Sequence, residues 1–155
     1  MKTLLATLTI LLLTLAASAL GQNATCVNNL TFGSVFPGIP ETVSKYTAGA
    51  AAEFYISGNA GDEITIDFDL PRYINLGGYN MRLIFTETDC AIDTVFPPDQ
   101  SNPEFDNLDP WHTMTYRLGS NGLTIWLGGK VVPAISQPAG DYTADVVITV
   151  DTTGN

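Results

Sequence analysis

The sequence predicts an all-β protein, an antiparallel Ig-like (pilin-like) β-sandwich of about eight strands. Apolar and polar residues alternate with period two over several short segments, as they do when one face of a strand lies in a core. The 14 Gly and 9 Pro supply turn signals between these segments, and only 14% of residues are charged, which is low for a helical protein. Hydrophobic residues make up 45% of the chain, enough for a packed core.

The N-terminus has the composition of a secretion signal. Lys2 precedes an apolar run over residues 4–15, and the small residues Ala-Ser-Ala follow at 17–19. A retained membrane anchor is the alternative, but a run of about a dozen apolar residues is shorter than the ~20 that span a bilayer. We therefore expect residues 1–19 to be a removed signal peptide. Residues 20–155 then form a single secreted domain, extracellular, on the cell surface or in a periplasm, with no stable membrane span.

The charge of the chain excludes two classes of partner. The net charge is −10, and removal of Lys2 leaves 5 basic residues against 16 acidic ones, a net charge of −11. The remaining basic residues are scattered and form no patch. Nucleic acids and anionic membrane surfaces both need a positive footprint, so neither is an expected partner.

The predicted strands follow one another along the chain. The clearest is 63–70, where Ile64, Ile66 and Phe68 alternate with acidic and hydroxylated residues. No helical period extends over a useful length. In chain order the predicted strands are residues 30–36, 52–57, 63–70, 81–86, 91–96, 113–118, 123–128 and 142–151.

The segments between the strands are predicted from their composition. Residues 57–62, Ser-Gly-Asn-Ala-Gly-Asp, predict a turn that joins the two flanking strands as a hairpin, and 119–122, Gly-Ser-Asn-Gly, is a second strong turn. Residues 42–54 have an alanine-rich centre, so a turn or two of helix is an alternative there, although Gly49 interrupts it. Proline-rich loops are expected at 36–41 and 97–112, and a loop as long as the second is functional or mobile.

Two cysteines, Cys26 and Cys90, remain after the signal. Secretion sends them to an oxidising compartment, where a disulfide between them is the default expectation. Two free, buried thiols are the alternative. A catalytic thiol is not expected, because the chain has one histidine and no local thiol motif surrounds either cysteine.

Motifs near both ends of the expected domain resemble a known family. They are Leu-Thr-Phe-Gly-Ser-Val at 30–35, Leu-Gly-Gly-Lys-Val-Val-Pro at 127–133, and Gln-Pro-Ala-Gly-Asp-Tyr-Thr-Ala at 137–144 before a valine-rich strand. Together they resemble small secreted bacterial domains of unknown function (the 4402 type), similar in pattern to spore coat protein U and fimbrial pilin domains. The resemblance does not extend to residues 75–112. It implies a surface or fibre component that self-assembles or joins other surface or fibre subunits.

The chain departs from the pilin pattern in one respect. Pilin domains of the chaperone–usher kind carry an N-terminal extension of alternating apolar residues, which completes a neighbouring subunit by strand addition. Here residues 20–25, Leu-Gly-Gln-Asn-Ala-Thr, precede Cys26 and show no such alternation. The domain is therefore self-complete, accepts a strand without donating a good one, or polymerises differently.

Catalytic groups are sparse in the sequence. His112 is the only histidine, and no Gly-x-Ser-x-Gly elbow accompanies it, so a Ser-His-Asp set is not predicted. Pairs of Asp or Glu side chains can supply glycosidase chemistry, but carboxylates on a strand face, such as Asp67 and Asp69, usually face water. We predict that the protein is not an enzyme.

Two ligand hypotheses concern the long loop and the strands after it. Calcium prefers oxygen ligands, and the loop holds several, although their spacing fits no EF-hand and solvation is the alternative. An aromatic group offers ring faces to a glycan, with core or interface packing as the alternative. Trp126 points outward if its neighbours point inward. It is then an exposed feature or a contact with another subunit, or, as the favoured alternative, it is buried under the long loop. The calcium candidates are Asp99, Glu104, Asp106 and Asp109, with Asn107, and the glycan candidates are Trp111, Tyr116 and Trp126.

These observations favour one function over two others. The signal, the simple strand composition and the family resemblance predict a secreted structural or adhesive protein, a subunit of a pilus, fibre or coat. The alternative is a soluble extracellular binding module for a glycan or a calcium-dependent ligand. No cofactor other than calcium is expected, and an enzyme ranks third.

Overall fold

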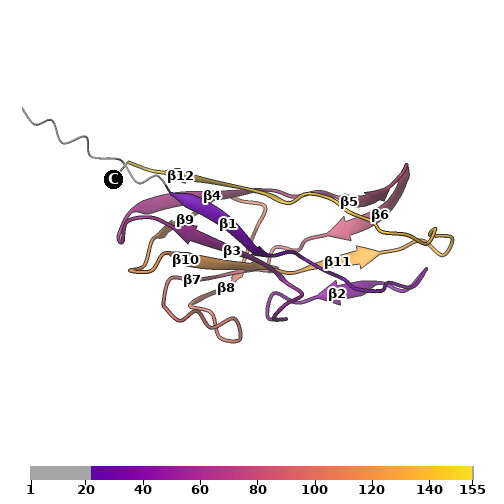
Figure 1. Ribbon diagram of the computed structural model, residues 1–155, viewed down its shortest axis with the longest axis horizontal. Helices are drawn as coiled ribbons and strands as arrows, with labels where there is room; N and C mark the ends of the chain where they lie inside the picture. Colours follow the sequence, from indigo (N-terminus) through magenta and orange to yellow (C-terminus); the bar gives the residue numbers. More distant parts are fainter. Residues whose placement is uncertain (1–21, 155) are drawn as a thin grey trace, which may run out of the picture.

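The computed structural model describes residues 22–154, and the predicted signal peptide at 1–19 lies outside them. The described chain is all-β, as predicted, and contains no helix long and apolar enough to cross a membrane. Its strands are β1 (Asn23–Asn28), β2 (Glu41–Val43), β3 (Ala52–Ser57), β4 (Glu63–Asp69), β5 (Tyr73–Leu76), β6 (Tyr79–Ile84), β7 (Cys90–Asp93), β8 (Phe105–Leu108), β9 (Met114–Arg117), β10 (Leu123–Leu127), β11 (Gly129–Val132) and β12 (Val147–Thr152) (Figure 1).

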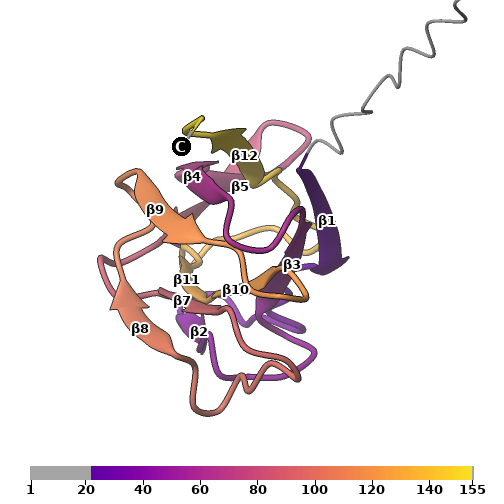
Figure 2. The same cartoon turned by 90° about the vertical axis from the view of Figure 1, so that its left-hand side faces the viewer.

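The strands form three antiparallel sheets. Sheet A has the order β1-β3-β10-β7-β8, sheet B the order β2-β11-β6-β5, and sheet C the order β12-β4-β9. Seen end-on, β12, β4 and β9 lie on one side of the molecule, while β3, β10, β7 and β8 lie on the other (Figure 2).

Sheets A and B share a continuous central segment. Only Gly128 separates β10 from β11, so residues 123–132 run through the middle of both sheets. On one side β2 pairs with β11 and β3 with β10, and on the other side β6 pairs with β11 and β7 with β10. The strands on either side of this segment are connected by two excursions: residues 44–51 lead from β2 to β3, and residues 85–89 lead from β6 to β7 (Figure 1).

The core lies between sheet C and the other two sheets. Ile64 and Ile66 of β4 are fully buried, as are Ile125 of β10 and Ile92 of β7, and all belong to one cluster. Aromatic rings also meet across the layers: Phe54 of β3 lies 5.8 Å from Phe68 of β4, between ring centroids. The layering is consistent with the predicted β-sandwich. The Ig-like, pilin-like connectivity remains a prediction.

The predicted strands match the structure where alternation is strong and differ at both ends of the chain. The expected first strand, 30–36, is not a strand, because Gly33 adopts a positive φ of 64° and breaks the extended run. The true first strand, β1, is exposed at a sheet edge and so needs no apolar face, which hides it from a search for alternation. The expected last strand, 142–151, becomes a strand only at Val147.

Three connections also required correction or choice. The predicted hairpin of β3 and β4 is wrong: β3 pairs within sheet A and β4 within sheet C, so the turn at 57–62 crosses between layers. The predicted loop 97–112 contains β8, which pairs with β7. The alternative of a helix within 42–54 is excluded, because residues 44–51 form turns instead.

The predicted disulfide between Cys26 and Cys90 is wrong, and both thiols are free. Cys26 lies on β1 and Cys90 on β7, with β3 and β10 between them in sheet A. Three strand spacings of about 4.8 Å put these positions about 14 Å apart, whereas a disulfide needs Cα atoms within about 7 Å. Sequence separation alone carries no information on this lateral distance.

We expect the two thiols to differ sharply in reactivity. Cys26 is exposed and Cys90 is fully buried, so iodoacetamide should label only Cys26 in the native protein and both cysteines after denaturation. Mass spectrometry of the labelled peptides, without any reducing agent, measures this. Finding both thiols inaccessible in denaturant until a reductant is added would contradict the structure.

Candidate functional site

The described structure contains a groove of about 900 Å³. Its floor is formed by core side chains, among them Phe54 of β3 and Met81 and Leu83 of β6. Its walls are two connecting segments, residues 29–35 after β1 and 137–146 before β12. In Figure 1 these segments are the indigo trace that follows β1 and the yellow trace that leads into β12.

The walls of the groove are held by few backbone hydrogen bonds. In the first wall the N–H of Thr31 donates to the carbonyl of Ala50 at 2.8 Å. In the second wall Thr143 exchanges a pair of backbone bonds with Asn75 of β5, at 2.8 and 3.1 Å. Neither wall is a strand, so much of its peptide backbone is not committed to a sheet. Extended backbone of this kind can pair with an added chain.

One end of the groove opens between two sheet edges. β1 is an edge of sheet A and β12 is an edge of sheet C, and the two lie near one another without pairing. The groove begins where β1 ends, at Cys26 and Asn28, and reaches Val146 just before β12. The site therefore combines an apolar floor with walls whose backbone makes few hydrogen bonds.

The three aromatic glycan candidates do not form one platform. Trp126 is 2% exposed and shares the outer face of sheet A with Ala91 and Asp93. The long loop is tied to that face, because the N–H of Asp99 donates to Asp93 Oδ2 at 3.0 Å. Tyr116 is partly buried against Phe105, with 4.7 Å between ring centroids.

Trp111 is the exposed member of the aromatic set, at 43%. Its Nε1 donates to the carbonyl of Phe85 at 2.9 Å, and its ring meets the Phe85 ring edge-on. The Arg72 guanidinium lies 5.9 Å from the centroid of the same ring. The indole is therefore fixed in orientation, with a cation already near it.

The four carboxylates proposed as calcium ligands each bond to a different part of the chain. Asp99 accepts from the N–H and hydroxyl of Ser101, which lowers the pKa of its carboxyl. Glu104 accepts from the Thr94 hydroxyl, and Asp109 accepts from the N–H of Trp111. Within residues 22–154, no group of three or more His, Cys, Asp or Glu side chains is placed to hold a metal ion. Calcium binding stays a prediction.

His112, the only histidine, is a surface residue. Its Nδ1 lies 2.7 Å from Asp109 Oδ2, with the imidazole largely exposed. Hydrogen bonds from the Trp111 N–H and then from His112, which outweigh a small desolvation cost, hold the pKa of Asp109 below its usual value. The prediction that the chain is not an enzyme stays a prediction.

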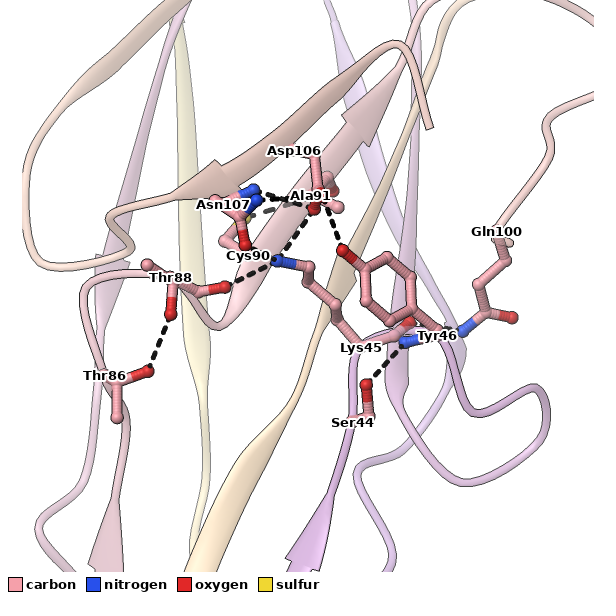
Figure 3. Close-up of polar contacts among 10 residues, drawn as sticks. All are labelled: Ser44, Lys45, Tyr46, Thr86, Thr88, Cys90, Ala91, Gln100, Asp106 and Asn107. Atoms are coloured by element: carbon pink, nitrogen blue, oxygen red, sulfur yellow. Dashed lines mark hydrogen bonds and ion pairs between the residues drawn. The ribbon is translucent and has the colours of Figure 1, made fainter. Parts of the chain in front are cut away.

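Asp106, the fourth carboxylate, belongs to a second candidate site at the junction of sheets A and B. Lys45, in the excursion between β2 and β3, is 5% exposed, and its Nζ lies 2.8 Å from Asp106 Oδ1 (Figure 3). Nζ also donates to the carbonyl of Thr88 at 2.6 Å and to Asn107 Oδ1 at 3.0 Å. We call Lys45, Tyr46, Asp106 and Asn107 the lysine cluster.

The lysine cluster perturbs the groups around it. Desolvation raises the pKa of Asp106, but hydrogen bonds from Lys45, Tyr46 and the Asn107 N–H, with the charge of Lys45, outweigh it and leave that pKa lowered. Donation of its hydroxyl to Asp106 raises the pKa of Tyr46. Cys90, on the neighbouring β7, has its pKa raised to about 12 by burial, against a lowering by Lys45.

Sequence reasoning missed Lys45 and Tyr46 as site residues and found Asp106 and Asn107 for a different reason. From sequence alone, a lysine in a short turn is expected to be a solvated surface charge. Only the tertiary structure shows that residues 85–89 and β8 cover Lys45. The one available signal was the rarity of basic residues in so acidic a chain. The groove walls, in contrast, coincide with the motifs at 30–35 and 137–144 that carried the family resemblance.

A comparison of the sequence with protein-family models gives no match, and a comparison with curated protein sequences gives none either. The resemblance to the secreted domains of unknown function, spore coat protein U and fimbrial pilins therefore remains a prediction.

Proposed function

We propose that the protein is a secreted structural or adhesive component, a subunit of a pilus, fibre or coat outside the cell or on its surface. The observation that carries this proposal is the groove. Its apolar floor and its lightly bonded walls suit an extended segment of a neighbouring subunit, which supplies backbone partners and side chains together. The neighbour is a second copy of this chain or another surface or fibre subunit.

Exposed apolar side chains elsewhere support an assembly role. Three large apolar side chains are exposed: Phe36, Ile39 and Ile135. The two segments that carry them lie side by side, because the N–H of Gly38 donates a hydrogen bond to the carbonyl of Ala134. Exposed large apolar side chains gathered in this way mark interaction surfaces more often than ordinary solvent faces.

Substitution in the groove tests the proposal. Ala144→Trp places a bulky ring in the groove from an exposed wall position, and we expect it to abolish or strongly reduce the assemblies that the native protein forms. Ala60→Trp, at an exposed position in the turn between layers, is the matched control and should assemble like the native protein. Gel filtration and electron microscopy of the purified proteins measure the outcome, with circular dichroism as a check of folding.

Two results would contradict self-assembly through the groove. One is a native protein that stays monomeric at high concentration, without filaments. The other is an A144W protein that assembles as well as the native one. The first result would leave two hypotheses: assembly with a different surface or fibre subunit, and the alternative of a soluble glycan-binding module. The support for the second is the oriented, exposed indole of Trp111.

A further inference from the structure

The lysine cluster brings an amine against a carboxamide. Lys45 Nζ lies 3.0 Å from Oδ1 of Asn107, and the carbonyl carbon of that amide is about 1.2 Å from the oxygen. The lysine side chain is buried and reaches the amide from a residue 62 positions away in the sequence. Reacting groups held at such separations react as one molecule, without the entropy cost of an encounter.

Asp106 touches both reacting groups. Its Oδ1 lies 2.8 Å from Lys45 Nζ, while its Oδ2 accepts from Asn107 Nδ2 at 3.0 Å. The Tyr46 hydroxyl donates to the same Oδ2 and fixes the carboxylate (Figure 3). These bonds define which end of the amide faces the amine, with the oxygen toward Lys45 and the nitrogen toward Asp106.

Asn107 is held in an unusual backbone conformation. Its φ of 53° makes it the one non-glycine residue with a positive φ in the described chain. Asparagine tolerates this region better than most residues, yet such conformations concentrate where the surroundings impose them. Here the imposed conformation keeps the Asn107 side chain within reach of Lys45.

We propose that Lys45 and Asn107 form an intramolecular isopeptide bond, with Asp106 carrying the protons. Proton transfer from the Lys45 ammonium to Asp106 is an uphill first step, because the hydrogen bonds around Asp106 favour its carboxylate form. The neutral amine that this transfer produces attacks the Asn107 carbonyl carbon, forming the new C–N bond as the carbonyl electron pair moves to oxygen. The intermediate collapses, the bond to Nδ2 breaks, and Asp106 protonates the leaving nitrogen.

The protons and electrons balance without a cofactor. The attacking nitrogen gives its extra proton to Asp106 as the amide forms, and the departing ammonia takes that proton away as ammonium. Asp106 returns to its carboxylate form, and no oxidant or reductant is consumed. The net change is one lysine ammonium and one carboxamide converted to one substituted amide and one ammonium ion.

The bond would link two segments of the chain at the junction of sheets A and B. It joins the excursion between β2 and β3 to β8, the edge strand of sheet A, across the segment that contains Thr88. The edge strand would then be covalently tied to the segment that leads into β3, which lies beyond β10 and β7 in the same sheet. This inference depends on the lysine cluster alone and not on the function proposed for the groove.

Mass spectrometry of the purified, folded protein tests the bond. We expect an intact mass lower by one ammonia than the sequence requires. Trypsin should leave the Lys45–Tyr46 bond uncut, so that the fragment ending at Arg72 stays attached to the fragment 83–117, which contains Asn107. A succinimide at Asn121-Gly122 also releases ammonia, so the attached fragments, rather than the mass alone, decide.

Variants separate the reaction from the fold. Lys45→Arg keeps the charge beside Asp106 but cannot form the bond, and Asn107→Ala keeps the ion pair but removes the carbonyl; both should yield separate fragments and no attached pair. Lys130→Arg, on an exposed residue of β11, should yield the attached fragments like the native protein. Separate fragments 46–72 and 83–117 from the native protein, or attached fragments from either cluster variant, would overturn the proposal.

Discussion

Replacing Ile125 with alanine should lower the free energy of unfolding by about 3 kcal/mol, within the range of about 2–5 kcal/mol for such truncations in a core. Ile125 is 0% exposed and sits in the middle of β10, between Phe54 of β3 and Ile92 of β7. The shortened side chain leaves a cavity facing sheet C, which the rigid strands on both sides cannot collapse to fill. Urea denaturation followed by tryptophan fluorescence measures the loss.

The same substitution on the surface is the control. Ile135 is 90% exposed, so Ile135→Ala should change the free energy of unfolding by no more than about 0.5 kcal/mol. Equal losses for the two variants would show that Ile125 is not part of a packed core, and would count against the two-layer arrangement.

Alkaline pH should destabilise the folded protein through Cys90. Burial raises the pKa of this thiol from 9.0 to about 12, so the folded state holds the proton more tightly than the unfolded state. The stability that this provides is complete below about pH 9 and is lost as the pH rises toward 12. At about 1.4 kcal/mol for each pH unit, the loss approaches 4 kcal/mol at the upper end of that window.

The variant Cys90→Ala isolates the contribution of the thiol. Tyrosines and lysines titrate in the same range in both proteins, so the informative quantity is the difference in free energy of unfolding between native protein and variant at each pH. This difference should be constant below pH 9 and should shift in favour of the variant above it. Parallel curves up to pH 12 would contradict the prediction.

Where one face of a strand is buried, the sequence predicts the strand well. In β3 and β4 the alternation of Phe54 and Ile56, and of Ile64 and Ile66, corresponds directly to burial. Alternation states which side chains are buried but not which strand lies opposite, so it could not show that β3 and β4 belong to different layers. Short, exposed strands such as β1 and β8 carry little pattern and were missed for that reason.

The candidate sites were less predictable than the fold because they depend on contacts between distant residues. Asp106 was found as an oxygen ligand, yet its role in the structure depends on Lys45, which comes from another excursion of the chain. The cysteines gave a wrong pairing, because composition and compartment say nothing about strand order. Trp126 was expected beneath the long loop if it pointed outward, and the structure confirms both its direction and its burial.

The position of residues 123–132 in the chain has a consequence for folding during synthesis. β3 and β7, like β2 and β6, emerge from the ribosome well before the segment that separates them in the finished sheets. Until that segment is made, their inner edges have no native partner, and the nascent chain presents apolar strands open to wrong pairing. Sheets A and B can therefore close only late, and a chain that ended before Leu123 would lack the strand around which both are built.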